Sequence, residues 1–214
     1  MKTSTLIWGL ALGGWLLGVS FVFTPCHEER NQAGGWPDLE AMLPGDHNNL
    51  KSGGVFRCEN ARVSFMSDAP LEVISAKSSK LRGVIDTAKQ TFAWSVDIRT
   101  FEGFNSPLQR EHFNENYMES KKYPKASFSG KLIEKIDFKK NGTYTIRTKG
   151  QLNIHGVDQE RIIKCIVEIS GKKIKVQSTF TVLLVDHNIS IPKVVYQKIA
   201  EEITVSVNAE LTEN

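Results

Sequence analysis

The sequence predicts an all-β fold, an antiparallel β-barrel of about eight strands with one helix near its mouth. Three observations lead to this fold class. From Val55 onward, apolar and polar residues alternate with a period of two. Turn residues separate the alternating runs, and one segment carries a clear helical pattern. Each predicted strand has one apolar face, and closing the sheet into a barrel covers that face and removes the exposed edges.

Residues 1–24 are predicted to form an export signal or an N-terminal anchor. Lys2 precedes an uncharged run whose apolar part extends from Leu6 to Phe23, which is the layout of an export signal. The run is also close to the ~18 residues at which a helix can span a membrane. Cleavage after Ser20 or Thr24 would release the chain, whereas an uncleaved segment would retain it. Phe23-Thr24-Pro25-Cys26 superficially resembles a lipoprotein cleavage site, from which Pro25 departs. All three alternatives place the protein outside the cytoplasm, in the periplasm or cell envelope.

Residues 25–54 are predicted to be a linker, which leaves residues 55–214 for the barrel domain. The composition shifts there to Gly, Pro, Asn, Asp and Glu, and no period of two or 3.6 is sustained. Gly53-Gly54 ends this stretch, and the first alternating run follows directly.

The strands follow from the alternation. Residues Thr91–Ile98 place Trp94 on the apolar face, and a shift of one residue would bury Asp97. We therefore expect the Trp94 side chain to point into the barrel. Further long strands are expected around Tyr144–Ile154, Ile163–Ile169, Ile174–Leu184 and Ile203–Leu211, and shorter ones at Val55–Phe65, Glu72–Ala76, Leu81–Asp86 and Ala126–Lys135.

Turn and cap residues place the connections. Asn141-Gly142 predicts a two-residue hairpin, and Ser170-Gly171 separates two alternating runs. Ser106-Pro107-Leu108-Gln109 supplies a helix cap, a first-turn proline and a capping-box glutamine, so a helix is expected from there to about Ser120. A second, short helix is expected around Pro192–Ala200.

The charge pattern excludes a nucleic-acid partner. The 27 Lys and Arg exceed the 24 Asp and Glu by a net charge of only +3, and the lysines stand among acids. No basic block with interleaved aromatic residues occurs. Apolar residues make up 40% of the chain, enough for a packed core. The sequence therefore predicts a packed apolar core under a solvated surface of mixed charge.

The three cysteines allow two interpretations. In an exported protein Cys58 and Cys165 could form a disulfide, leaving Cys26 free or removed. Alternatively, the first two are buried thiols that act as small apolar residues. Neither a Cys-x-x-Cys pair nor a metal-ligand spacing occurs.

No motif for catalysis, a metal or a cofactor is found. The histidines are His27, His47, His112, His155 and His187, and none of them has metal-ligand or zinc-protease spacing. A Gly-x-Ser-x-Gly elbow is also absent from the sequence. His155 is expected to make a structural hydrogen bond at a strand end. His112 on the helix is expected either to pack or to contact the polar head of a ligand.

Several motifs, taken together and in order, resemble the YceI-like domain over roughly Val55 to Leu211. They are Gly83-Val84-Ile85-Asp86, Phe104-Asn105-Ser106, His112-Phe113, Lys122-Tyr123-Pro124-Lys125-Ala126-Ser127-Phe128, Gly150-Gln151-Leu152-Asn153-Ile154-His155-Gly156-Val157 and the last strand, Ile203–Leu211. The resemblance implies a lipocalin-like barrel of about eight strands with a helix at its mouth. It also implies an apolar pore, which in some members holds a polyisoprenoid chain. Several members of the family are exported. Asp158-Gln159-Glu160-Arg161 and Tyr117-Met118-Glu119 depart from the family's pattern.

The sequence and the resemblance together predict a binding protein, not an enzyme, that holds a long apolar lipid of the polyisoprenoid or prenylated-quinone kind. Its partners would be that lipid and a membrane surface or another lipid donor or acceptor. The residues expected to line the pore are Phe65, Phe92, Trp94, Val96, Ile98, Phe101, Phe104, Phe113, Tyr117, Phe128, Leu152, Ile154 and Phe180. The alternatives are an enzyme acting in the same pore and a structural or interaction protein whose barrel is filled.

Overall fold

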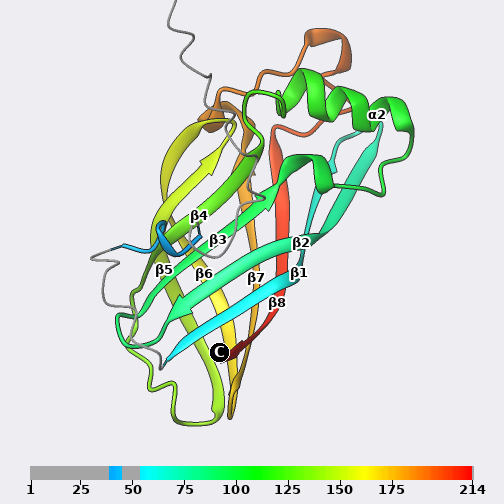
Figure 1. The fold of residues 1–214 in the computed structure, drawn as a ribbon. Coiled ribbons are helices and arrows are strands. Elements are labelled where there is room, and N and C mark those ends of the chain that lie inside the picture. Colours follow the sequence, from blue (N-terminus) through cyan, green and yellow to red (C-terminus); the bar gives the residue numbers. More distant parts are fainter. Residues whose placement is uncertain (1–38, 45–53, 214) are drawn as a thin grey trace, which may run out of the picture. The chain divides into compact units, whose positions relative to one another are not determined.

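Eight antiparallel strands, in chain order, close into a barrel (Figure 1). The computed structural model describes residues 39–44 and 54–213. All of these residues belong to one compact unit. The strands are β1 (Val55–Asp68), β2 (Val73–Asp86), β3 (Thr91–Asp97), β4 (Lys125–Leu132), β5 (Gly142–Ile154), β6 (Val157–Ser170), β7 (Lys173–Leu183) and β8 (Glu202–Glu213). Pairing of β1 with β8 completes the barrel and confirms the predicted fold class.

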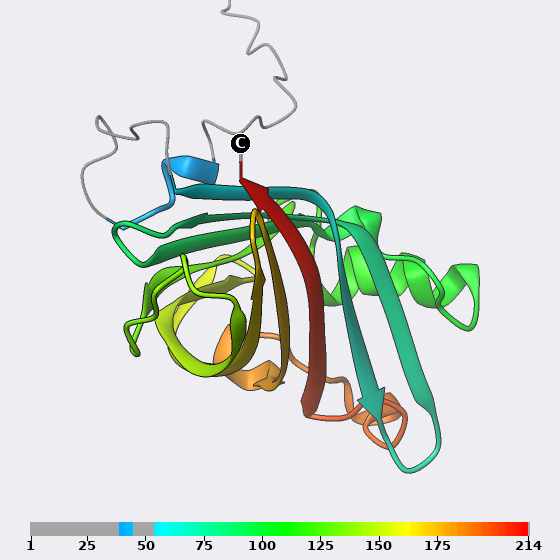
Figure 2. The same ribbon diagram turned by 90° about the horizontal axis from the view of Figure 1, so that it is seen from below.

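Short helical segments lie at one end of the barrel (Figures 1 and 2). Between β3 and β4 these are η2 (Ile98–Thr100), α2 (Pro107–His112) and the π-helical turn η3 (Phe113–Tyr117), and between β7 and β8 they are η4 (Leu184–His187) and η5 (Lys193–Val195). The hydroxyl of Ser106 accepts a hydrogen bond from the Gln109 amide at 3.2 Å, as the cap sequence predicts. The helix ends before the predicted Ser120 because Glu119 has a left-handed backbone with φ of 42°. The expected helix around Pro192–Ala200 is reduced to η5.

Two connections differ from the prediction. Asn141-Gly142 is not a two-residue hairpin: residues 133–141 form a longer loop, and Gly142 begins β5. The Asn141 side chain instead accepts a hydrogen bond from the Gly171 amide at 2.8 Å, which joins this loop to the β6–β7 turn. The two short strands expected on either side of Lys77 are one strand, β2, because its ladder with β1 continues through two register shifts.

The barrel is closed at the end opposite the helical segments. Ile169, Ile174 and Leu211 are almost fully buried there. The loop of residues 133–141 adds Ile136 to the same core cluster. The Gln90 side chain holds this loop with two hydrogen bonds, donating to the Ile136 carbonyl at 2.8 Å and accepting from its amide at 3.3 Å. This packed end is called the floor below.

Two paired glycines allow β4 and β5 to approach closely. Gly130 lies opposite Gly150 in the ladder. A Cβ atom on Gly130 would lie 2.1 Å from the Lys149 carbonyl oxygen, and one on Gly150 would lie 2.1 Å from that of Ser129. Backbone atoms cannot move aside as a flexible side chain can, so these positions require glycine.

A short segment of the predicted linker packs on the outside of the barrel. Leu39 and Leu43 are buried against outward-facing apolar residues of three strands, namely Val55 of β1, Val84 of β2 and Ala93 of β3. The Glu40 carboxylate accepts a hydrogen bond from Arg57 Nε at 2.8 Å. Residues 39–44 are thus part of the folded unit.

The predicted export segment, residues 1–24, lies outside the described residues, as do Cys26, His27 and His47. Within residues 39–44 and 54–213, no helix has the length and hydrophobicity needed to cross a membrane. Export therefore stays a prediction.

The glycine pair gives a stability test. Gly130→Ala should destabilise the fold by about 1–3 kcal/mol, because its methyl group meets fixed backbone atoms of β5. Lys131→Ala, on the exposed side of the same strand, is the control and should change stability by less than about 0.5 kcal/mol. Urea unfolding midpoints measure both, and equal stability of the two variants would contradict the close approach of the strands.

Candidate functional site

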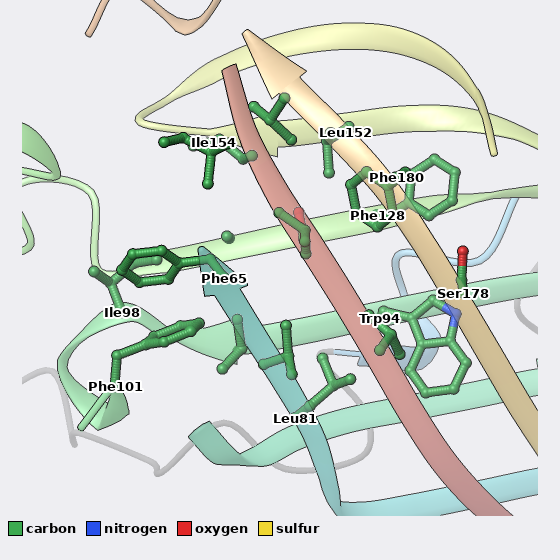
Figure 3. Close-up of a pocket in the computed structure, with 18 of the residues that line it drawn as sticks. Phe65, Leu81, Trp94, Ile98, Phe101, Phe128, Leu152, Ile154, Ser178 and Phe180 are labelled. Atoms are coloured by element: carbon green, nitrogen blue, oxygen red, sulfur yellow. The ribbon is translucent and has the colours of Figure 1, made fainter. Parts of the chain in front are cut away.

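An apolar cavity of about 490 Å³ lies inside the barrel, between the floor and the helical end. Figure 3 shows large side chains such as Trp94, Phe128 and Phe180 around it. The structure places every predicted pore residue in its wall: Phe65, Phe92, Trp94, Val96, Ile98, Phe101, Phe104, Phe113, Tyr117, Phe128, Leu152, Ile154 and Phe180. Their contact with a ligand stays a prediction. A cavity of this size does not fit the alternative of a barrel filled by its own side chains.

Trp94 points into the barrel, as its position in the alternating run predicts. It is half-buried, packs against the core cluster and lines the cavity. Its ring lies across Gly83 of the neighbouring strand, where a Cβ atom would be 2.0 Å from the indole. Asp97 stays on the solvent side and accepts a hydrogen bond from the Arg99 amide at 2.9 Å as the cap of η2. The register argued from Asp97 is therefore confirmed.

Four phenylalanines form the aromatic part of the mouth. The ring of Phe65, from β1, stacks on that of Phe113, from η3, with centroids 5.2 Å apart. Phe101 and Phe104 complete the group, with ring centroids 5.6 and 6.0 Å from Phe65. These contacts join η3 to the barrel strand β1, which is far from it in the sequence, and so hold the helical segment over the cavity.

The charged, amide and imidazole side chains of the wall gather at the opening. Gln109 Nε2 of α2 donates a hydrogen bond of 2.6 Å to Glu72, at the start of β2. His112 and Lys198 line the same opening and are exposed. Sequence reasoning named His112 but missed Glu72, Gln109 and Lys198, since these residues come from three separate segments and share no spacing. It also missed aliphatic wall residues such as Leu81, which the parity of β2 could have identified.

Along the seam between β6 and β7, backbone hydrogen bonds give way to side-chain hydrogen bonds. Their backbone ladder covers only Cys165–Ser170 and Lys173–Ser178. Toward the mouth, side chains bridge the two strands instead. Ser178 Oγ donates to the Lys164 carbonyl at 2.8 Å, and Arg161 Nη2 donates to the Thr181 carbonyl at 2.8 Å.

Further bridges join β6 to η4 at the same seam. Gln159 Nε2 donates to the Asp186 carbonyl at 2.7 Å, and His187 Nδ1 contacts the Val157 carbonyl at 3.2 Å. His187 is fully buried, and this burial lowers the pKa of its imidazole below the ordinary value. The neutral ring is therefore favoured for this last residue of η4.

His155 has the structural role that was expected of it. One ring nitrogen lies 3.1 Å from the His187 carbonyl and the other 2.7 Å from a Glu119 carboxylate oxygen. The ring also contacts Tyr123 edge-on, with centroids 4.6 Å apart. These contacts tie the β5–β6 turn to both helical segments at the mouth.

The disulfide that the sequence allowed is not formed, since Cys58 and Cys165 are free and buried. Their strands, β1 and β6, are not neighbours in the barrel. Burial raises the pKa of the Cys58 thiol to about 12 and that of Cys165 to about 11. The two thiols thus serve as small apolar core residues, which was the alternative interpretation.

The cavity has the chemistry of a site for an apolar chain. Its depth is lined by aliphatic and aromatic side chains with a few hydroxyls, while Glu72, His112 and Lys198 stand at the opening. Over the part of the chain that the structure describes, no group of three or more His, Cys, Asp or Glu side chains could hold a metal ion. An enzyme in this pore would need titratable groups converging on the ligand inside it.

Comparisons with known proteins agree with this geometry. The YceI-like domain model matches residues 56–211, which confirms the resemblance in the sequence. A polyisoprenoid binding domain from Saccharophagus degradans has the same fold, with 13% identity and a TM-score of 0.65 over 75% of this chain and 99% of its own. BcnA from Burkholderia cenocepacia matches with 15% identity and a TM-score of 0.59 over 70% and 95% of the two chains. The YceI protein of Campylobacter jejuni matches with 18% identity and a TM-score of 0.51 over 64% and 83%. No curated protein matches the chain.

Trp94→Ala should lower stability and ligand content together. The indole has one side on Gly83 and the other on the cavity, so we expect a loss of about 2 kcal/mol. Phe92→Ala is the matched control, because Phe92 is almost fully buried on the same face of β3 and should cost about 3–5 kcal/mol. Urea midpoints measured beside the lipid content of each purified variant would show this. A Trp94→Ala protein unchanged in both would contradict the placement of the indole.

Acid should loosen the seam through His187. Because its folded-state pKa lies below the ordinary 6.5, the stability it contributes is present above pH 6.5 and is lost as the pH falls below that value. The wild type should therefore lose more stability than His187→Gln between about pH 7.5 and about pH 5.5. Identical pH slopes for the wild type and His187→Gln would refute the prediction.

Proposed function

This chain belongs to the YceI-like family, and from that premise we propose that it is a binding protein for a long apolar lipid of the polyisoprenoid or prenylated-quinone kind. The observation that carries the proposal is the cavity of about 490 Å³, walled by apolar side chains and closed at the floor. This volume falls in the range of small-ligand sites. Each methylene group moved from water into such a cavity contributes about 0.8 kcal/mol, so a prenyl chain gains more than a short ligand.

The polarity of the cavity gives the bound lipid a direction. Toward the floor the wall includes the apolar side chains of Phe138, Val167 and Val176. Ile174 and Leu211 belong to the same core and have no exposed surface. The opening offers the His112 imidazole, the Lys198 ammonium group and the Glu72 carboxylate. Burying an unpaired polar head among the floor residues would be costly. The tail would therefore lie toward the floor, and the head at the opening near His112.

The solved structure from Saccharophagus degradans supports the ligand class, since that protein is described as a polyisoprenoid binding domain. We extend this ligand class to the present chain because the fold is shared and the cavity is apolar. The apolar run of residues 6–23 supports export to the periplasm or cell envelope, with the N-terminal segment either cleaved or kept as an anchor.

The test is the lipid content of the full chain, purified from the envelope fraction of an expressing bacterium. Solvent extraction followed by mass spectrometry should recover about one prenylated lipid per barrel, and the intact mass should show whether residues 1–24 remain. Phe128→Asp, which places a carboxylate in the cavity wall, should reduce the lipid recovered, whereas Lys131→Asp on the outside of β4 should not. A protein that is empty, and that takes up neither a polyprenyl lipid nor a prenylated quinone, would disprove the proposal.

A further inference from the structure

Exposed apolar side chains are concentrated at the open end of the barrel. In the described residues, seven large apolar side chains are more than half exposed: Leu71, Val73, Leu108, Ile162, Val185, Val194 and Tyr196. All except Ile162 lie in the connections at the open end or at the adjoining start of β2. Exposed apolar side chains lower the solubility of a folded protein, so a cluster of them at one end indicates a contact surface.

Four of these residues lie on two segments that the fold joins at the open end. Leu71 and Val73 lie at the β1–β2 hairpin, and Val194 and Tyr196 lie in and after η5. The two segments run side by side in Figures 1 and 2. The Leu71 amide donates a hydrogen bond to the Gln197 carbonyl at 3.0 Å, which joins them. We call Leu71, Val73, Val194 and Tyr196 the docking rim.

The docking rim is continuous with the opening of the cavity. Along residues 194–199 the side chains divide between the two sides: Val194 is 89% exposed, whereas Val195 and Ile199 line the cavity. At the hairpin, Leu71 is 66% exposed, whereas Ile74 lines the cavity. The apolar surface therefore passes from the outside of the molecule into the pore over the same two segments.

The η5 half of the rim carries positive charges. From Asn188 to Ala200 the chain carries Lys193 and Lys198 and no acidic residue, and both lysines are exposed. On the hairpin half of the rim, Glu72 is engaged by Gln109 and the exposed Asp68 pairs with Val73 in the ladder. The positive charge therefore lies on the η5 half, before Glu201 and the start of β8 at Glu202. Lysine and tyrosine beside exposed apolar residues suit the boundary between anionic lipid headgroups and acyl chains.

We propose that the docking rim, with Lys193 and Lys198, seats the open end of the barrel on a lipid bilayer that contains anionic headgroups. In this position an apolar lipid passes between bilayer and cavity over Val194 and Val195 without crossing water. The transfer step rests on the proposed function, whereas the docking itself does not. Without such a contact the whole apolar tail of the lipid would have to be exposed to water during loading, which is unfavourable.

A fluorescent label at the rim tests the docking in the full chain, whatever the state of residues 1–24. Tyr196→Cys and Lys140→Cys are made in a Cys26→Ser background and coupled to a polarity-sensitive dye. Cys58 and Cys165 are too deeply buried to compete. With vesicles of phosphatidylcholine and phosphatidylglycerol, the dye at 196 should shift to the blue, and the dye at 140, near the floor, should not. No shift at 196 with these vesicles, or equal shifts at both sites, overturns the proposal and leaves the rim to a different partner.

A second pair of variants examines the charge and the transfer step. Lys193→Gln combined with Lys198→Gln should weaken the dye's response to anionic vesicles about tenfold, with little effect on neutral ones. Val194→Asp should slow the exchange of a fluorescent prenyl lipid between vesicles while the purified variant keeps its bound lipid. Unchanged exchange by Val194→Asp with full lipid content would reject the docking rim and leave lipid binding intact. A protein that contains no lipid but whose dye at 196 still shifts would reject lipid binding and leave the docking rim intact.

Discussion

Closure of the sheet between β1 and β8 is the constraint on which the other features depend. The ladder of Arg62–Met66 with Thr204–Asn208 turns one face of every strand inward. Once the ring is complete, alternating side chains enclose a space that only apolar groups can occupy without cost. The same closure leaves two unlike ends, one packed by Ile169, Ile174 and Leu211 and one covered by helical segments. The cavity is what remains between them.

Alternation was enough to predict the wall because it is a local property. Trp94, Phe128 and Leu152 could be assigned to the inside from their own strands, and the structure puts them there. The mouth could not be predicted in this way. Glu72 and Gln109 are 37 residues apart and meet only because β2 and α2 are brought together by the fold. The seam was equally invisible, since β6 alternates regularly along a stretch where its ladder to β7 has ended.

Some strong local signals were overridden by tertiary contacts. Asn141-Gly142 favours a tight hairpin. In the structure a longer loop carries Ile136 into the floor, where Gln90 holds it. Likewise, Cys58 and Cys165 were compatible with a disulfide by composition, but barrel topology keeps their strands apart. In both cases the decisive information is which strands are neighbours, and no single run of residues contains it.

The packed floor has a consequence for selectivity. A tube closed at one end has a fixed depth, and Phe138, from the loop that Gln90 holds at Ile136, lines the wall toward that end. When a lipid enters such a tube tail first, the closed end limits the length of the tail that can be buried. Carbons beyond that depth must stay outside or fold back, where they gain no burial. For a lipid bound as proposed, the floor would limit the length of the tail without contacting the head, so molecules with different heads and similar tails would be treated alike.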